Sequence, residues 1–372
     1  MIKNTLQNEN AQNKNALQNV RDEIKTVPIE EYAIDSKPDN IKANLSLNIN
    51  PFGVSKKVMK RLKELDSAKI CCYYPENKKL IKLIAEYVKM ESENILIGDG
   101  CDGCLEMIAK TFIAKNDNVV IPIPTFHRYE FHTRVMGGNC IFVQMKDFLF
   151  DADLILKEAA KKNAKMIFLC DPNNPTGLEI GKEEKLKLIE NFPGIVVVDE
   201  ALADITSINS SRLIKENKNL IVVRSFSKSF GLASLRIGYI VADQNLISFI
   251  RKVSSPFKVN GIAQELAIEA LQDKEHIKES IKFLNEERGY LISELEKMGL
   301  QCTKSTTTNF LVNIEQIGHV KNVIINLQQK GVMVTDASFF KIHDNKYIRV
   351  AVGSKEENRF FIKTIKDILG FS

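Results

Sequence analysis

The strongest constraint on the fold is a series of short, almost wholly apolar segments that alternate with helical patterns. Residues 164–170, 194–200 and 220–223 are such segments, and a helical pattern over 182–190 separates the first two. Strands that are apolar on both faces are typical of a mainly parallel sheet covered by helices on each side. The sequence therefore predicts an α/β fold whose large domain has three layers, with a mainly parallel sheet in the middle.

Polar residues stand at the carboxyl ends of these three segments. Asn174 lies in the loop after the first, Asp199 is near the end of the second, and Lys228 follows the third. In open α/β sheets, ligands bind beyond the carboxyl ends of the strands. We therefore expect these three side chains to lie close together in one site.

The segment around Lys228 has the chemistry of a site that binds a carbonyl compound with a phosphate group. A lysine amine can form a Schiff base with a carbonyl carbon. Ser225, Ser227 and Arg236 could hold the phosphate, the arginine through a bidentate contact. Most lysines are solvated surface charges, so this interpretation depends on the other motifs of the chain.

A second anion site is indicated at residues 94–103, whose pattern predicts a strand, a glycine turn and the start of a helix. The free N–H groups at such a helix start attract phosphate, although an ordinary tight turn has the same pattern. Cys101 and Cys104 form a Cys-x-x-Cys pair there. No second Cys or His pair stands at metal-ligand spacing, so we expect no metal site.

Composition argues against several functional classes. The chain has 372 residues, 44% of them hydrophobic and 27% charged, which is an ordinary soluble globular balance. The net charge is +5, but the basic residues form no stripe, so we expect no nucleic-acid partner. No apolar run approaches the roughly 20 residues of a membrane span. Seven scattered cysteines and a polar N-terminus without a signal peptide favour the cytoplasm.

The pattern divides the chain into four parts. Residues 1–19 are rich in Asn and Gln, and we expect a disordered tail. Residues 20–53 hold a short amphipathic pattern and a Pro/Gly loop, which predicts an N-terminal arm. Residues 54–270 should form the large domain. Residues 271–372 alternate between strand and helix patterns, which predicts a smaller α+β domain.

Together these motifs resemble the fold-type I pyridoxal-phosphate enzymes, within the class I and II aminotransferases. The resemblance runs from about Val20 to the C-terminus and includes every motif in order. The chain is most similar to the histidinol-phosphate aminotransferases, and the threonine-phosphate decarboxylases come second. The resemblance implies pyridoxal 5'-phosphate as cofactor and a small amino-acid or keto substrate, phosphorylated or not.

The resemblance also implies roles for single residues at the cofactor. Lys228 would bind the cofactor covalently and then move the proton at the substrate Cα, and Asp199 would hold the proton on the ring nitrogen. Asn174 would hydrogen-bond the phenolic oxygen, and Phe126 would stack on the ring. The phosphate would be held by Cys101, Asp102, Ser225, Ser227 and Arg236.

Other residues match positions at the substrate and at a subunit interface. Arg349 would hold the substrate α-carboxylate through a bidentate pair. Asn50 and Tyr32 match further substrate-side positions. Tyr74 matches a tyrosine that reaches the phosphate of the neighbouring subunit's cofactor, which implies a homodimer with shared sites.

Two positions depart from the aminotransferase pattern. Leu202 stands three residues after Asp199, where these enzymes usually carry a tyrosine that bonds the phenolic oxygen. Thr335 stands where histidinol-phosphate aminotransferases usually carry an arginine for the substrate phosphate. Lys341 or Arg128 could supply a cation in its place.

These departures leave two reactions open. The loop Asn48-Ile-Asn-Pro51 resembles the decarboxylases, which also lack the tyrosine replaced by Leu202. The segments 226–239 and 352–358 resemble the aminotransferases instead. We therefore expect transamination, with decarboxylation of a phosphorylated amino acid as the alternative. A binding protein without catalysis is a third hypothesis, and the presence of Lys228 and Asp199 argues against it.

Overall fold

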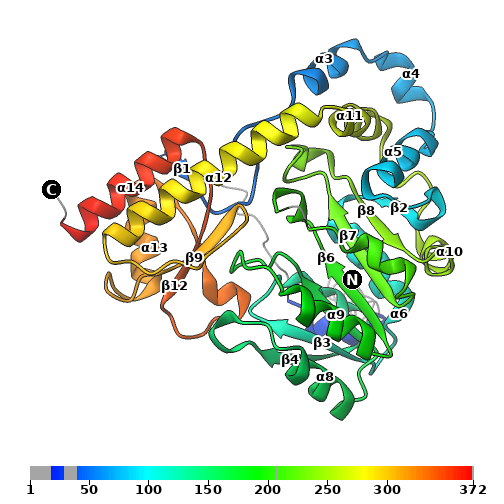
Figure 1. Cartoon of the computed structure of the whole chain (residues 1–372), viewed down its shortest axis with the longest axis horizontal. Coiled ribbons are helices and arrows are strands. Elements are labelled where there is room, and N and C mark those ends of the chain that lie inside the picture. The colour runs from blue at the N-terminus through cyan, green and yellow to red at the C-terminus, as the bar shows by residue number, and fades with distance from the viewer. Residues whose placement is uncertain (1–17, 29–39, 207, 371–372) are drawn as a thin grey trace, which may run out of the picture.

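The computed structural model describes residues 18–28, 40–206 and 208–370, which form a larger and a smaller unit (Figure 1). The tail expected over residues 1–19 lies almost entirely outside this description, and so does Tyr32. The predicted α/β class is confirmed, because helices cover a mainly parallel sheet on both faces.

The larger unit contains seven strands of one sheet within the described residues. Six strands run parallel to one another, and the remaining strand, β8, runs antiparallel to both of its neighbours. The order across the sheet is β2 (Ile95–Gly98), β8 (Gly238–Ala242), β7 (Leu220–Ser225), β6 (Ile195–Asp199), β5 (Met166–Cys170), β3 (Asn118–Ile123) and β4 (Asn139–Gln144). The antiparallel β8 was not predicted, because its five residues follow directly on the segment that contains Lys228.

The two faces of the sheet bury separate hydrophobic cores, as the alternation of side chains along a strand requires. In β6, Val196 and Val198 pack into one core and Val197 into the other. The first core is covered by α3 (Lys56–Glu64), α5 (Lys78–Val88), α8 (Ala152–Lys161), α9 (Lys182–Asn191) and α11 (Gly261–Gln272). The second core is covered by α6 (Gly100–Phe112), α7 (Arg128–Val135) and α10 (Gln244–Val253). No helix of the described segments is long and apolar enough to cross a membrane.

The smaller unit is an α+β layer with a core of its own. Its antiparallel sheet has the order β11 (Thr335–Asp336), β12 (Tyr347–Ala351) and β9 (Asn309–Asn313). Helices α13 (Val320–Gln329) and α14 (Lys355–Leu369) pack on this core. The strand predicted over 332–336 is two short strands, since β10 (Val332–Met333) leaves the sheet to pair with β1 (Ala43–Asn44).

Two segments connect the units. Helix α12 (Lys274–Lys297) begins at the larger unit, where Ile277 joins the first core, and continues into the smaller unit, where Leu284 and Leu291 are buried (Figure 1). Ala43 and Leu45 of the N-terminal arm are buried in the smaller unit's core. We propose that residues 54–270 and 271–372 are two domains, and that the arm belongs structurally to the second.

Shorter helices surround this frame. Helix α2 (Asp22–Thr26) lies against α7, and α4 (Ser67–Cys72) lies against α11. The sequence over about 260–298 predicts a long helical region with a break near Asp273, and the break is confirmed, because α11 ends and α12 begins there. Ser55 stands directly before the helical pattern that ends near Leu65, which predicts a helix cap. In the structure it accepts hydrogen bonds from the N–H groups of Lys57 and Val58 and donates one to Asp273. This serine therefore fixes α3 to the junction of α11 and α12.

Replacing Ser55 should measurably destabilise the protein. We expect Ser55→Ala to lower the free energy of unfolding by about 1 kcal/mol, because a helix loses its cap and Asp273 loses a donor. Urea denaturation followed by circular dichroism measures this difference. The control is Ser67→Ala at an exposed serine beside the cap Asp66, which should change stability by less than about 0.5 kcal/mol. Equal losses in both variants would contradict the role given to Ser55.

Candidate active site

Most of the predicted site residues line one cavity of about 490 Å³. Its floor is formed at the carboxyl ends of β5, β6 and β7, where Cys170, Asp199 and Ser225 end their strands. Residues 46–49 of the arm line it as well, and the smaller unit contributes Thr335, Phe339, Phe340 and Arg349. A second cavity of about 490 Å³ shares only Cys170 with the first, and none of its described lining residues is basic. The chemistry of the chain therefore lies in the first cavity.

Lys228 is the nucleophile that this cavity offers. It follows β7, and its Nζ donates a hydrogen bond to the carbonyl oxygen of Asn48 at 2.5 Å. Burial, together with the positive charge of Arg349, lowers the pKa of the Lys228 amine to about 8. A much larger fraction of this amine is neutral near pH 7 than of an exposed lysine, and only the neutral amine attacks a carbonyl carbon.

Asp199 is a buried carboxylate with two donors. Its Oδ1 accepts the N–H of Ala201 at 3.0 Å, and its Oδ2 accepts the hydroxyl of Tyr129 at 2.9 Å. Burial raises the pKa of Asp199 to about 6, although both hydrogen bonds favour the charged form. A buried carboxylate of this kind is well suited to hold a protonated nitrogen of a ligand.

An anion cup lies at the start of α6. The first N–H groups of a helix have no partner within it, and here they belong to Gly100, Cys101 and Asp102. Arg236 comes so close to Gly100 that a Cβ at this glycine would stand 2.7 Å from its Nη2, and the φ of +84° also favours glycine. Ser225 and Ser227 line the cavity beside them. The five residues predicted to bind phosphate are therefore together.

The carboxylate of Asp102 is already paired with neighbouring side chains. It accepts two hydrogen bonds from Arg128, at 2.7 and 3.1 Å, and it contacts His132 Nε2 at 2.9 Å. Burial alone would raise the pKa of Asp102, but His132 and Arg128 hold it well below its usual value. This residue can therefore offer an anion its backbone N–H but not its side chain.

Asn174 and Arg349 meet on the other side of the cavity. Arg349 Nη1 donates to Asn174 Oδ1 at 3.2 Å, and Nη2 donates to Thr335 Oγ1 at 2.9 Å and to the carbonyl oxygen of Ser46. Thr335 in turn donates to the same carbonyl oxygen at 3.0 Å. The threonine that stands in place of an arginine thus supports Arg349. Of the two cations that could compensate, Arg128 lines the cavity, whereas Lys341 pairs with Glu130 at 2.7 Å and does not.

Two apolar side chains complete the wall. Phe126 lines the cavity and lies edge-on to Tyr129, with ring centroids 5.7 Å apart. Leu202 also lines the cavity, and its buried side chain packs into the core of the smaller unit. The position that departs from the aminotransferase pattern therefore faces the site, and leucine offers no hydrogen bond there.

Two described residues that were predicted for the site do not line the cavity, and a third predicted residue is not described. Asn50 is buried, but its amide donates to the carbonyl oxygen of Ser229 at 3.0 Å and to Ser280 Oγ at 2.7 Å. Tyr74 is exposed and stacks on Phe257, with ring centroids 4.4 Å apart. Tyr32 lies outside the described residues. The roles proposed for these three residues rest on the sequence alone.

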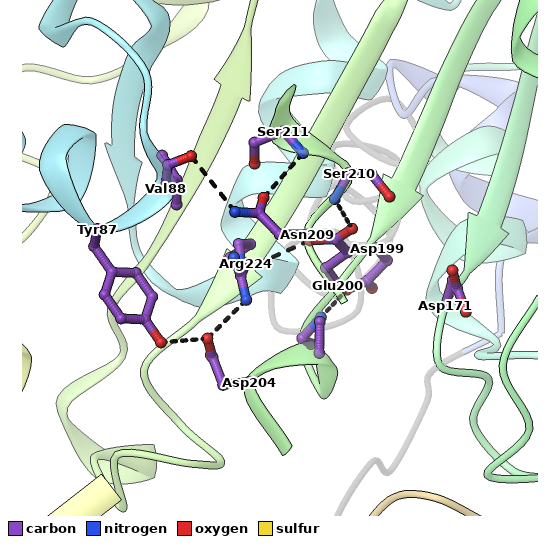
Figure 2. Close-up of polar contacts among 12 residues, drawn as sticks. Tyr87, Val88, Asp171, Asp199, Glu200, Asp204, Asn209, Ser210, Ser211 and Arg224 are labelled. Atoms are coloured by element: carbon purple, nitrogen blue, oxygen red, sulfur yellow. Dashed lines mark hydrogen bonds and ion pairs between the residues drawn. The ribbon is translucent and has the colours of Figure 1, made fainter. Parts of the chain in front are cut away.

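A buried ionic cluster behind Asp199 was missed at the sequence level. Figure 2 shows Arg224 between Glu200 and Asp204, with Tyr87 beyond Asp204. Arg224 Nη2 donates to Asp204 Oδ1 at 2.7 Å, and Tyr87 donates to the same oxygen at 2.7 Å. The sequence did contain a signal for this cluster: Arg224 stands near the end of an otherwise apolar strand, and a buried arginine requires an acidic partner nearby. Tyr129 was missed for a different reason, since its contact depends on how α7 lies on the sheet.

A family model described as "Aminotransferase class I and II" matches residues 40–365. The chain is a class I and II aminotransferase. A histidinol-phosphate aminotransferase of Thermoanaerobacter pseudethanolicus is 35% identical over 355 residues, which covers 94% of this chain and 98% of the relative. A histidinol-phosphate aminotransferase of Methanococcoides burtonii is 36% identical over 328 residues, which covers 87% of this chain and 89% of the relative.

Two solved structures are similar in fold. The histidinol-phosphate aminotransferase from Sinorhizobium meliloti, in complex with pyridoxal-5'-phosphate, has a TM-score of 0.85 at 22% identity and covers 95% of this chain and 98% of its own. The L-threonine-O-3-phosphate decarboxylase from Porphyromonas gingivalis has a TM-score of 0.77 at 27% identity, and the match covers 88% of this chain and 99% of the decarboxylase. The resemblance to both subfamilies that the sequence indicated is confirmed.

The aminotransferase depends on pyridoxal 5'-phosphate, and its cavity fits that cofactor. Lys228 offers an amine of lowered pKa for the aldehyde, and Asp199 a buried carboxylate for the ring nitrogen. The helix start at Gly100 and the guanidinium of Arg236 form a cradle of the right charge for the phosphate. The aldehyde, the ring nitrogen and the phosphate of the cofactor therefore each have a counterpart of suitable chemistry.

The hydroxyl of Tyr129 should hold the pKa of Asp199 down. In Tyr129→Phe the charged carboxylate loses a donor, so the pKa of Asp199 should rise by about one pH unit, which corresponds to ~1.4 kcal/mol. Isotope-edited infrared spectroscopy of the apoprotein measures the midpoint, which we expect near pH 6 in the wild type. Tyr347→Phe serves as the control, because Tyr347 lies on β12 of the smaller unit and does not line the cavity. A midpoint that stays in place in Tyr129→Phe would exclude this hydrogen bond.

Proposed function

We propose that this aminotransferase moves the amino group of a small amino acid to a keto acid, and that Lys228 carries the proton at the substrate Cα. The observation that carries the proposal is the pair formed by an amine of lowered pKa and a buried, doubly hydrogen-bonded carboxylate at neighbouring strand ends. The named relatives support a substrate of the histidinol-phosphate type, since two of them are 35% and 36% identical to this chain over the aligned residues.

The reaction divides into tasks for this chain's own residues. When bound, the cofactor supplies an electron sink for the electron pair left at the substrate Cα. Asp199 holds the proton on the ring nitrogen that keeps this sink effective, and the Tyr129 hydroxyl orients that carboxylate. Lys228 would take the proton from the substrate Cα as a general base and hold it for return as a general acid. Arg349 holds the substrate carboxylate by its planar guanidinium, which Asn174 and Thr335 orient.

We further propose a homodimer in the cytoplasm. Tyr73, Tyr74 and Phe257 form a group of exposed aromatic side chains, with exposed fractions of 72%, 78% and 56%. Exposed apolar groups of this kind are typical of protein interfaces, and a second copy would cover them.

None of the seven cysteines, all of which lie in described segments, forms a disulfide, which supports a reducing compartment.

Decarboxylation of a phosphorylated amino acid is the second candidate, because one observation favours it. Leu202 faces the cavity without a hydrogen-bond donor, which agrees with the decarboxylase pattern. The solved decarboxylase has 27% identity to this chain. The two reactions differ in what they consume, since only transamination requires an amino-group acceptor.

A product assay distinguishes the two reactions. We expect glutamate to form from 2-oxoglutarate and histidinol phosphate, which has no carboxylate to lose, and no carbon dioxide to form from O-phosphothreonine when the acceptor is omitted. Lys228→Ala should reduce turnover at least a hundredfold, or ~2.7 kcal/mol in the activation free energy. The control is Lys341→Ala, whose lysine lies outside the cavity wall. Carbon dioxide released from O-phosphothreonine without an acceptor would establish the decarboxylase instead.

The lowered pKa of Lys228 should also determine how fast the apoprotein captures its cofactor. Only the neutral amine reacts, so the rate of capture should rise with pH and level off above about 8. Stopped-flow absorbance of the cofactor between 410 and 430 nm gives this rate. A profile that keeps rising towards the usual lysine pKa of 10.5 would show that burial does not lower the pKa of Lys228.

A further inference from the structure

The turn after Asp199 connects three parts of the molecule. Asp199 itself accepts the N–H of Ala201, the next residue but one. Leu202 then lines the cavity and is buried in the core of the smaller unit, which Ile205 joins as well. A shift of this turn would therefore move a donor of Asp199, the cavity wall and the contact between the units at the same time.

The guanidinium of Arg224 contacts two carboxylates of this turn from behind. Arg224 Nη2 donates to Asp204 Oδ1 at 2.7 Å, and Arg224 Nε lies 3.7 Å from Glu200 Oε2 (Figure 2). Glu200 also accepts the N–H of Ser210 at 2.7 Å. The side chains of Arg224, Glu200 and Asp204 have exposed fractions of only 4%, 0% and 2%. Arg224 thus contacts a carboxylate at each end of the turn, and it does not line the cavity itself.

We propose that Arg224 is a positioning residue of this enzyme: it clamps the turn 200–204 from behind and so keeps the Ala201 N–H on Asp199 and Leu202 at the cavity wall. This inference rests on the role proposed above for Asp199. It assigns a function to an arginine that touches neither the cofactor cup nor the substrate wall. It also explains why a charged residue occupies a fully buried position on β7.

The clamp has an electrostatic consequence for Asp199. Glu200, the next residue, brings a second carboxylate close to Asp199, and Arg224 supplies a positive charge beside Glu200 and Asp204. Asp199 is otherwise faced by Tyr129 from α7, Cys101 and Asp102 from α6, Cys170 from β5, and Lys228. Burial keeps Tyr129 and both cysteines neutral, because it raises their pKa values. The negative charge of Glu200 raises the pKa of Asp199 and the Ala201 N–H lowers it, so loss of the clamp that keeps this N–H in place should raise the pKa of Asp199 further.

The test compares substitutions at two positions of the same strand. Arg224→Met removes the charge, whereas Val222→Ala removes only apolar contacts from a residue that is 0% exposed. Isotope-edited infrared titration of the full-length protein should give an Asp199 midpoint about one pH unit higher in Arg224→Met, a tenfold increase in proton affinity, and an unchanged midpoint in Val222→Ala. Equal midpoints in the two variants would overturn the proposal.

Arg224→Lys keeps the test decisive if Arg224→Met does not fold, and a double variant tests the charge balance if it does. Arg224→Lys retains the charge but cannot reach both carboxylates, so the Ala201 amide should exchange its hydrogen at least tenfold faster. Wild-type protection of that amide would overturn the clamp. Adding Glu200→Gln to Arg224→Met removes the nearest unbalanced charge and should return the midpoint towards the wild-type value. If the wild-type protein bound no cofactor, the proposed function would be contradicted, but these titrations would be unaffected. The proposed function and the proposed role of Arg224 are therefore tested independently.

Discussion

The site depends on one physical constraint, which is that the carboxylate of Asp199 is buried. An ionised group without partners is very costly to bury, so the fold must surround it with donors and balanced charge. Tyr129 supplies one donor and the backbone of Ala201 the other. Behind it, Arg224 balances the two acids that follow. A bound cofactor with a protonated ring nitrogen would be the remaining partner of this carboxylate.

The site is assembled from distant parts of the chain. Arg349 reaches Asn174 across 175 residues of sequence and Ser46 across 303. The sheet of the larger unit supplies the lysine, the carboxylate and the anion cup, whereas the smaller unit supplies the arginine and two phenylalanines. The cavity therefore exists only when both units and the arm are in place, which connects substrate binding to the packing between them.

The sequence predicted the parts of this arrangement that local rules govern. The apolar strands, the cap at Ser55 and the helix break at Asp273 each follow from a few neighbouring residues. Asn174, Asp199 and Lys228 could be grouped because parallel strands end at the same edge. The contacts of Tyr129, Arg224 and Asn50 could not be predicted, since each depends on the relative placement of elements far apart in sequence. Strand β8 and the division of 332–336 into two strands depend on pairing partners, which local patterns do not specify.

The short parallel pair between β1 and β10 has a consequence for biosynthesis. Ala43 pairs with Val332, and Leu45, two residues later, is buried in a core formed mainly by the last hundred residues. When the arm leaves the ribosome, the strand that it pairs with has not yet been made. The arm therefore remains unpaired through most of translation. The strands of the central sheet are all made before residue 243, so that this sheet can form while the arm is still unpaired. The active-site cavity, whose wall includes residues 46–49, would be among the last features of the nascent chain to form.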